Sequence, residues 1–440
     1  MKLLKKFAFL LFTTALFLGC DSDEKIDDLF DNNDSKADIE WSANLSKTIS
    51  AALFRTSPAI DENDNIYILQ KEYVGEGFTI DAFNKNGEKR WSKTNTTDVL
   101  LESQLTYYDG KLFVHCHDNR IICFNAENGD VIWNKRVTDS YNHARNFTIA
   151  NNMLIYRADK TLTEYEWHLF ALDISSGDVN YELDLTQFRE NEEDEDRKHA
   201  FFEQSTLAAN GNMVYFADDI HLFAIEATSS AFIVKWNSNL PDDVDLFHSY
   251  GTSGHQNNKI AIAPNGKIIV QYNVAVENLY DYKTAVYSPD GTLLWTHYYE
   301  NNNGSITTDA QSNVYMGGAS LLKLNGSNGS TSWTANPPLF IGSITNQVKG
   351  KDGRIYASDF FGVYIVNNSG SVVSNMSAGA NTDSQPFSNL SLLSNGNIVV
   401  IAQGIDSGQI FCFKSSSEGV AKNIWAKREG NAKNTFNLKH

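Results

Sequence analysis

Short segments in which apolar and polar residues alternate recur along most of the chain. Residues 57–69 read SPAIDENDNIYIL, and residues 78–91 read FTIDAFNKNGEKRW. Such alternation, rich in Val, Ile, Tyr and Phe, is typical of β-strands that bury one face. Asn-Gly, Asp-Gly and Ser-Gly pairs separate the segments, and these pairs accept the positive φ of a tight hairpin turn. The pattern therefore predicts an all-β chain built from antiparallel hairpins.

The hairpins themselves belong to a longer repeat. Its clearest marker is a turn followed by a tryptophan, as in NGEKRW (86–91), NGDVIW (128–133), DGTLLW (290–295) and NGSTSW (328–333). Aligning these turns gives eight units of four strands, one unit every ~40–50 residues, which is the signature of β-propeller blades. We expect a single propeller of eight four-stranded blades, with seven as the alternative.

The recurring tryptophan opens the outermost strand of its unit. A large ring at a fixed place in each blade can pack against the next blade. Trp133, Trp295 and Trp333 are therefore expected to be largely buried between blades, as structural and not catalytic residues.

Two segments, one near each end of the chain, could supply the fourth strand of the last blade. IEWSANL (39–45) resembles a fourth strand without a blade of its own, and it would remove an open sheet edge by pairing with the final unit. Trp425 could occupy the same place from the other end of the chain. The sequence leaves both arrangements open.

The repeat resembles the PQQ-type (quinoprotein-like) β-propeller family over roughly residues 39–435. The matching elements are SPAI (57–60), LFALD (169–173), LFAIE (222–226), the Gly-x-x-x-Trp turns and the segment 425–435. The architecture is also similar to the propeller lipoprotein of the outer-membrane β-barrel assembly machine. The resemblance implies the fold, but one fold hosts many activities.

The enzymes of this family imply further residues that the chain does not show. Their sites use PQQ, a metal ion held by carboxylate and amide oxygens, a catalytic aspartate and often a vicinal cysteine pair. No Cys-Cys pair occurs, and no cluster of Asp, Glu and Asn matches such a site. We therefore expect a non-enzymatic protein without a cofactor.

Composition narrows the range of partners. The 440 residues include 42% hydrophobic residues, enough for a large core, and the formal net charge is −18. An acidic surface disfavours nucleic acid, whose phosphates attract Lys and Arg. We expect a monomeric propeller that does not bind nucleic acid.

The N-terminus is typical of a bacterial lipoprotein signal. MKLLKK precedes a short apolar run, and FLGC ends at Cys20. We expect residues 1–19 to be removed and Cys20 to be acylated, which would anchor the protein; an ordinary secretory signal is the alternative. Nine acidic residues between positions 21 and 40 resemble the export signals of surface lipoproteins. The expected organisation is signal 1–19, tether 20–38, propeller 39–435 and C-terminal tail 436–440, at the outer membrane and displayed on the cell surface.

Several possible sites have simpler structural explanations. His115 and His117 lie two residues apart on a predicted strand but lack an obvious third metal ligand. DENDN (61–65) has oxygen-rich side chains but occupies a position where other units have an ordinary turn. Cys123 and Cys412 occupy a position that is small or apolar in most units; a Cys116–Cys123 disulfide depends on register.

The long insertions fall at one kind of connection. The first-to-second and third-to-fourth turns are short, whereas the second-to-third turns and blade-to-blade links hold nearly every insertion. These loops supply the binding candidates Tyr141, Trp167, Phe247, Tyr250, Tyr280 and Tyr282. The leading hypothesis is an envelope-anchored module or scaffold that binds a protein or glycan. The alternatives are a periplasmic outer-membrane assembly scaffold and, less favoured, a PQQ-dependent dehydrogenase.

Overall fold

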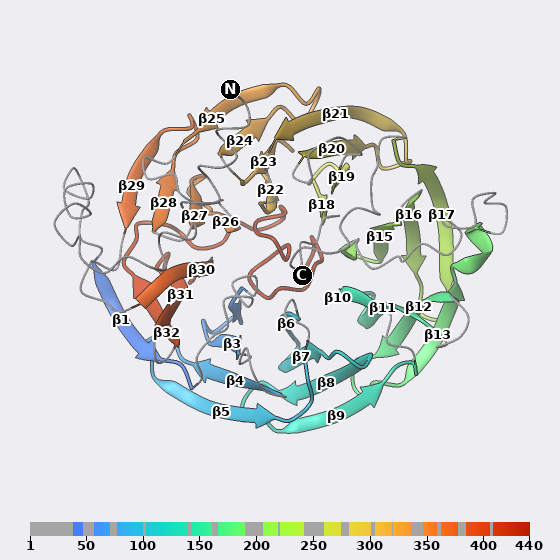
Figure 1. The fold of residues 1–440 in the computed structure, drawn as a ribbon, viewed down its shortest axis with the longest axis horizontal. Coiled ribbons are helices and arrows are strands. Elements are labelled where there is room, and N and C mark those ends of the chain that lie inside the picture. Colours follow the sequence, from blue (N-terminus) through green and yellow to red (C-terminus); the bar gives the residue numbers. More distant parts are fainter. Residues whose placement is uncertain are drawn as a thin grey trace, which may run out of the picture.

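The protein is an eight-bladed β-propeller (Figure 1). Its computed structural model describes residues 38–46, 57–70, 77–99, 103–139, 143–160, 166–189, 206–218, 221–241, 259–273, 281–300, 304–318, 320–336, 346–358, 362–376, 384–404 and 408–440. Within these ranges, helical structure is limited to the 3₁₀ turn η3 (Thr186–Arg189), and no helix is long and apolar enough to cross a membrane. The eight four-stranded blades expected from the repeat are confirmed.

In the first seven blades, strands pair in chain order from the central axis outward. Blades 1 and 2 contain β2 (Ala59–Ile60), β3 (Ile66–Gln70), β4 (Phe78–Phe83), β5 (Lys89–Asn95), β6 (Leu105–Tyr108), β7 (Lys111–His115), β8 (Arg120–Asn125) and β9 (Val131–Arg136). Blades 3 and 4 contain β10 (His143–Ala150), β11 (Met153–Asp159), β12 (Trp167–Asp173), β13 (Val179–Asp184), β14 (Ala208–Asn210), β15 (Met213–Ala217), β16 (His221–Ala227) and β17 (Phe232–Asn239).

The second half of the ring repeats this order. Blades 5 and 6 contain β18 (Lys259–Ile262), β19 (Ile268–Asn273), β20 (Asp281–Tyr287), β21 (Leu293–Glu300), β22 (Ile306–Thr308), β23 (Val314–Met316), β24 (Leu321–Leu324) and β25 (Thr331–Ala335). Blade 7 contains β26 (Asn346–Lys349), β27 (Ile355–Ser358), β28 (Val363–Val366) and β29 (Val372–Met376), and blade 8 combines β30 (Ser384–Leu392), β31 (Ile398–Gly404), β32 (Gly408–Phe413) and β1 (Ile39–Asn44).

Strand β1 closes the ring by pairing with β32. Trp41 lies opposite Cys412, just as Trp133 lies opposite Cys123 in blade 2. The N-terminal strand therefore provides the fourth strand of blade 8, and the N- and C-terminal parts of the propeller are joined in one sheet. Trp425 does not compete for this place, because it lies in the interior of the ring, 1% exposed.

The tryptophans of the outer strands connect each blade to the next. The indole N–H donates to a backbone carbonyl in the third-to-fourth turn of the following blade: Trp41 to Lys85 (2.9 Å), Trp91 to Ala126 (3.1 Å), Trp133 to Ile174 (3.0 Å), Trp236 to Pro289 (3.0 Å), Trp295 to Gly326 (3.3 Å) and Trp333 to Asn368 (3.0 Å). In blade 3 the Tyr181 hydroxyl takes this role and donates to Thr228 O. One geometry is thus used in seven of the eight blades.

A glycine in the receiving turn makes this contact close. Gly329 has φ +73°, and a Cβ at this position would lie 2.4 Å from Cε3 of Trp295. The turn requires the left-handed backbone that glycine adopts without strain, and the ring requires the missing side chain. The pairing of Gly-x-x-x-Trp in the sequence therefore serves two interfaces: the glycine receives one tryptophan, and the tryptophan of the same motif docks on the next blade.

The expected burial of these rings is confirmed for two of the three named. Trp133 and Trp295 are 7% and 8% exposed, whereas Trp333 is only half-buried.

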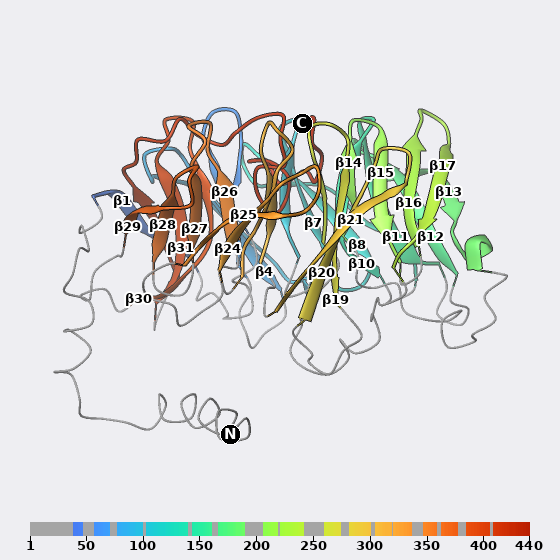
Figure 2. The same ribbon diagram turned by 90° about the horizontal axis from the view of Figure 1, so that it is seen from above.

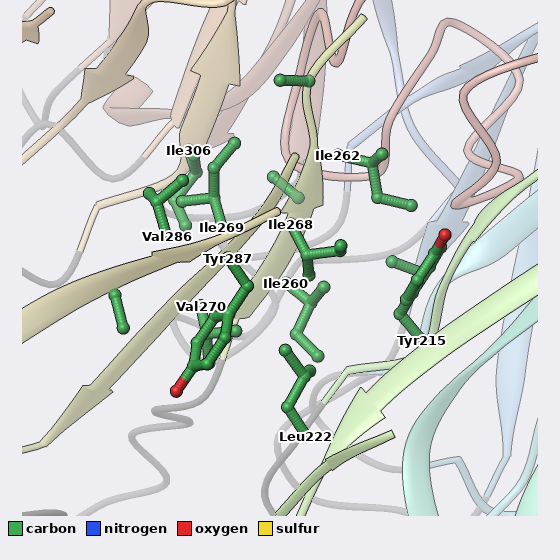
Figure 3. Close-up of a cluster of buried hydrophobic side chains, with 14 of the residues drawn as sticks. Tyr215, Leu222, Ile260, Ile262, Ile268, Ile269, Val270, Val286, Tyr287 and Ile306 are labelled. Atoms are coloured by element: carbon green, nitrogen blue, oxygen red, sulfur yellow. The ribbon is translucent and has the colours of Figure 1, made fainter. Parts of the chain in front are cut away.

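The hydrophobic core lies between adjacent blades and runs around the ring. Figure 3 shows one part, where Tyr215 and Leu222 of blade 4 lie beside Ile260 and Ile262 of blade 5. The same cluster continues to Ile306 of blade 6. Each blade therefore buries apolar side chains on both of its faces, which explains the nearly continuous burial of the middle strands.

The C-terminal segment fills one end of the central channel (Figure 1). It accepts hydrogen bonds from the innermost strands of six blades: Ile60 N to Ala432 O (2.9 Å), Tyr107 N to Lys433 O (2.9 Å), Ile149 N to Thr435 O (3.3 Å), Ala209 N to Phe436 O (2.7 Å), Thr308 N to Trp425 O (2.8 Å) and Lys349 N to Ala426 O (2.7 Å). We call residues 420–440 the plug. Residues 436–440, set apart in the sequence as a tail, are continuous with it, since Phe436 and Leu438 pack in the core.

The plug carries a buried ion pair. Lys427 Nζ lies 3.5 Å from Glu429 Oε2, and both side chains are fully shielded from solvent. Ser57 Oγ donates to Glu429 Oε1 (3.0 Å), and Lys427 Nζ donates to Pro58 O (3.3 Å). Burial lowers the pKa of Lys427, although the charge of Glu429 opposes this effect. The pair ties the plug to the start of blade 1.

Replacing Trp133 by Ala should destabilise the protein by about 3–5 kcal/mol, because it removes a buried ring from the interface of blades 2 and 3. Trp133→Phe should cost less, since it keeps most of the packing and loses the hydrogen bond to Ile174. Ile132→Ala is the matched control, because Ile132 is the next residue of the same strand and is 44% exposed. Denaturant unfolding measures all three; equal losses for Trp133→Ala and Ile132→Ala would contradict the docking role.

Glu429→Ala should cost about 3–5 kcal/mol, because Lys427 would stay buried without its counter-charge. The double variant Lys427→Met/Glu429→Leu should recover most of the loss, since it removes both charges and keeps apolar volume. Chemical denaturation of the two variants and the wild type is the measurement. A double variant that is no more stable than Glu429→Ala would show that the charge pair is not the cause.

Candidate functional site

The two faces of the ring have different structures. On one face, which we call the turn face, lie the short turns, such as those at Gly110 and Gly129, together with the plug (Figure 2). On the opposite face, the insertion face, lie the strand ends that flank the long insertions. Examples are Asp159 at the end of β11 and Trp167 at the start of β12. The antiparallel order of each blade produces this separation.

The expectation that the Trp167 ring is exposed for binding is wrong. It is 1% exposed and packs in the cluster that joins blades 3 and 4. The guanidinium of Arg157, itself buried, lies 5.6 Å from the Trp167 ring and 5.1 Å from that of Phe216. Arg157 also donates to Ala217 O of blade 4 (3.3 Å). The aromatic and cationic side chains thus stabilise a blade interface, and the first residue of a strand is already inside the core.

The other binding candidates are placed only in part. Tyr282 is the second residue of β20, at the insertion-face end of blade 5, opposite Asn273 and Tyr299. Tyr141, Phe247, Tyr250 and Tyr280 lie outside the described residues, as does Cys20. Their roles therefore stay predictions.

The histidine pair is separated by the end of its strand. His115 is the last residue of β7, is buried, and lies 2.7 Å through Nε2 from the hydroxyl of Tyr156. That hydroxyl donates to Asn119 Oδ1 (2.7 Å), so the imidazole belongs to a buried polar network between blades 2 and 3. His117 lies beyond the strand and is exposed. The two rings do not share a ligand position.

The described cysteines are free thiols. Cys116 N donates to Arg120 O, whereas Cys123 pairs with Phe113 three residues away along the hairpin, so the two thiols do not face each other. Burial raises the pKa of Cys123 to about 12, with a small opposing effect of Lys111. Burial raises the pKa of Cys412 to about 12 as well. Both behave as small apolar side chains.

The oxygen-rich segment 61–65 is an ordinary turn. Asp61 accepts hydrogen bonds from the backbone N–H groups of Asn63 and Asn65 and from the hydroxyl of Tyr67 (2.8, 2.9 and 3.0 Å). Asp309 in blade 6 accepts from the corresponding groups of its own turn. The carboxylates thus stabilise the turns through hydrogen bonds, and these bonds account for the oxygen-rich sequence without a calcium ion.

A pocket on the turn face is the site that sequence reasoning missed. It has a volume of about 510 Å³ and lies between blade 6, blade 7 and the plug. Four lysines take part in its lining: Lys323, Lys349, Lys351 and Lys422. The remaining lining residues are Asp309, Ala310, Gln311, Tyr315, Gly350, Gly353, Asn368, Ala421 and Ile424. A lysine-rich cavity stands out in a chain of net charge −18.

One signal for this pocket was present in the repeat. The third strand of each blade has a position opposite the fourth-strand residue that docks on the next blade in seven of the eight blades. This position is occupied by Ala82, Cys123, Ala171, Ala224, Val286, Lys323, Ile365 and Cys412. Lys323 is the single charged member. The other lysines come from the innermost strand of the next blade, its turn and the plug, and only the fold brings them together.

The described residues do not fit a quinone site of the dehydrogenase kind. The turn-face end of the channel is filled by the plug. Within the described ranges, no three His, Cys, Asp or Glu side chains gather in a way that could hold a metal ion.

Comparisons with known proteins agree with this architecture. Residues 76–244, from blade 1 to the link after blade 4, match the model of a PQQ-repeat family described as outer membrane protein assembly factor BamB. Among the curated proteins, none matches the chain.

Three solved structures show the same fold. BamB from Moraxella catarrhalis has a TM-score of 0.55 at 15% identity, covering 86% of this chain and 100% of that one. The quinohemoprotein alcohol dehydrogenase from Comamonas testosteroni has a TM-score of 0.56 at 9% identity, covering 88% and 78%. The Dos1 propeller has a TM-score of 0.56 at 11% identity, covering 89% and 98%. The chain is a β-propeller whose architecture resembles that of BamB, and part of it, residues 76–244, matches the PQQ-repeat family model.

Proposed function

We propose that the protein is a non-catalytic scaffold, anchored to the outer membrane, that binds a protein partner on its insertion face. The observation that carries this proposal is the occupation of the channel by the plug, which leaves the surface of the ring for recognition. A closed ring with a filled channel is a rigid support for loops, and loops on rigid supports commonly carry binding residues. The similarity to an assembly factor supports a protein over a glycan as the partner.

The anchor is proposed from the N-terminal sequence. Cys20 would be acylated after removal of residues 1–19, and residues 20–38 would form the tether. The tether joins the propeller at β1, on the outermost strand of blade 8, away from the central axis. Nineteen residues can span roughly 60 Å when extended, so the tether leaves either face free to meet a partner.

The proposal has two forms, which differ in the side of the outer membrane on which the propeller lies. The acidic tether favours display on the cell surface, whereas the similarity to BamB favours the periplasm. Protease treatment of intact cells distinguishes them: cleavage before lysis supports surface display, and protection until lysis supports a periplasmic assembly scaffold.

Cys20→Ser should release the protein from membranes or leave it unprocessed, because the serine hydroxyl cannot replace the thiol in acylation. Carbonate washing of membranes, followed by immunoblotting, measures the bound fraction. Truncating the side chain of Ile132 provides a matched control, since it changes the propeller surface and keeps the cysteine. A Ser variant that stays in the washed membranes would contradict the lipid anchor.

A photo-crosslinking residue placed at Phe247 should capture a partner in intact cells, whereas the same residue at Val373 should not. Val373 lies on the outer strand β29 and is 51% exposed, so it samples the circumference of the ring. The combined truncation Phe247→Ala/Tyr250→Ala should lower partner binding by about 10-fold or more at unchanged folding. Identical crosslinks from both positions, or unchanged binding by the double variant, would count against recognition by the insertion face.

A further inference from the structure

The lysine-lined pocket on the turn face carries uncompensated positive charge. Among the described residues of its lining, Asp309 supplies the one carboxylate against four lysines. Asp309 is also already engaged: its oxygens accept from the N–H groups of Gln311 and Asn313 (3.0 and 2.9 Å) and from the hydroxyl of Tyr315 (2.9 Å). Lys323 Nζ lies 3.6 Å from it. One lysine is thus paired, and the others still lack a counter-charge from the lining.

Lys349 forms the floor of the pocket. It is 4% exposed, and its ammonium group donates to the carbonyl of Gly353 and lies near neutral oxygens of Tyr315 (3.4 Å) and Asn368 (3.3 Å). No carboxylate among the described residues forms an ion pair with it. A buried ammonium group without an anion pays a desolvation cost that a bound anion would offset.

The floor is held rigidly. Lys349 N donates to Ala426 O and its carbonyl accepts from Ala421 N, so the plug fixes the backbone on both sides of the side chain. Two ammonium groups lie over the Tyr315 ring, with Nζ of Lys349 4.4 Å and Nζ of Lys323 5.3 Å from its centroid. Contacts between a cation and an aromatic face orient the two lysines before a ligand arrives.

The mouth of the pocket adds two more cations. Lys351 and Lys422 are exposed, and they come from the first-to-second turn of blade 7 and from the plug. The positive charge is therefore arranged at two levels, with Lys349 and Lys323 at the floor and Lys351 and Lys422 at the entrance. Such an arrangement suits a ligand with more than one anionic group.

We propose that this pocket binds a small polyanion that carries two or more carboxylate or phosphate groups. Lys349 would bind one anionic group at the floor, and Lys351 and Lys422 would bind another at the mouth. The ammonium group of lysine is a compact charge that accepts either kind of anion. The site lies on the face opposite the proposed protein-binding surface and does not depend on the partner proposed above.

Calorimetric titration of the mature chain with citrate and, separately, with pyrophosphate tests the proposal at constant ionic strength. At least one probe should bind saturably, and preference between the two identifies carboxylate or phosphate as the natural chemistry. Lys351→Gln/Lys422→Gln should weaken binding by about tenfold, because each removes one charge-assisted contact at an exposed position. Lys349→Met should abolish binding.

Lys439→Gln is the matched control. Lys439 is an exposed lysine of the same plug on the same face, but it does not line the pocket. Its replacement should leave the affinity unchanged while removing one charge from the surface. The proposal is overturned if neither probe saturates below about 10 mM, or if Lys439→Gln and the pair Lys351→Gln/Lys422→Gln weaken binding equally.

The pH dependence gives an independent readout. Burial, opposed by the charges of Asp309 and Asp352 and assisted by that of Lys323, lowers the pKa of Lys349 to about 8. Burial raises the pKa of Tyr315 well above its usual range, so this hydroxyl stays neutral, and hydrogen bonds hold the pKa of Asp309 low despite its burial. The carboxyl groups of citrate are ionised throughout the pH range in which Lys349 titrates, so the affinity of citrate should fall about tenfold as Lys349 loses its proton above that pKa. An affinity that is constant across this range would overturn the role of Lys349.

Discussion

The docking of an outer-strand ring onto the turn of the next blade is the interaction on which the rest of this structure depends. A four-stranded blade buries apolar side chains on both faces, so it is stable only between two neighbours. The indole or phenol groups fix the spacing and orientation of those neighbours through one hydrogen bond and one close contact with the turn. Trp41 carries the same contact from blade 8 to blade 1, where the N-terminal strand closes the ring. Every blade of the closed ring therefore packs between two neighbours.

Closure also links the stability of the ring to the two ends of the propeller. Strand β1 completes blade 8, and Ser46, just after it, donates through N and Oγ to the buried carboxylate of Asp81 in blade 1 (both 2.7 Å). Burial opposes ionisation of this carboxyl, but hydrogen bonds from Ser92 and Ser46 lower the pKa of Asp81. At the other end, the plug is bonded to six blades at once. Residues far apart in the chain therefore hold the ring from its circumference and from its axis.

The plug also shapes the turn face of the ring. It fills the turn-face end of the channel with buried side chains such as Trp425, Lys427 and Phe436. At the same time its own backbone forms one wall of the lysine-lined pocket, next to blades 6 and 7. The turn face consequently offers a compact cationic cavity among short turns, and the strand ends that flank the long insertions lie on the opposite face.

The sequence by itself determined the repeat, the number of blades, the turn positions and the docking role of the tryptophans, because each depends on residues within one unit of ~40–50 positions. It also placed Cys123, Lys323 and Cys412 at equivalent positions, which the strand register confirms. Only the tertiary structure shows that β1, and not the segment around Trp425, supplies the fourth strand of the last blade. Both segments contain a tryptophan that suits this position. The burial of Trp167 and the existence of the lysine-lined pocket are also visible only in the tertiary structure. They arise from contacts between blades and with the plug, and a local pattern of apolar and polar residues contains no information about which side chains of different blades meet.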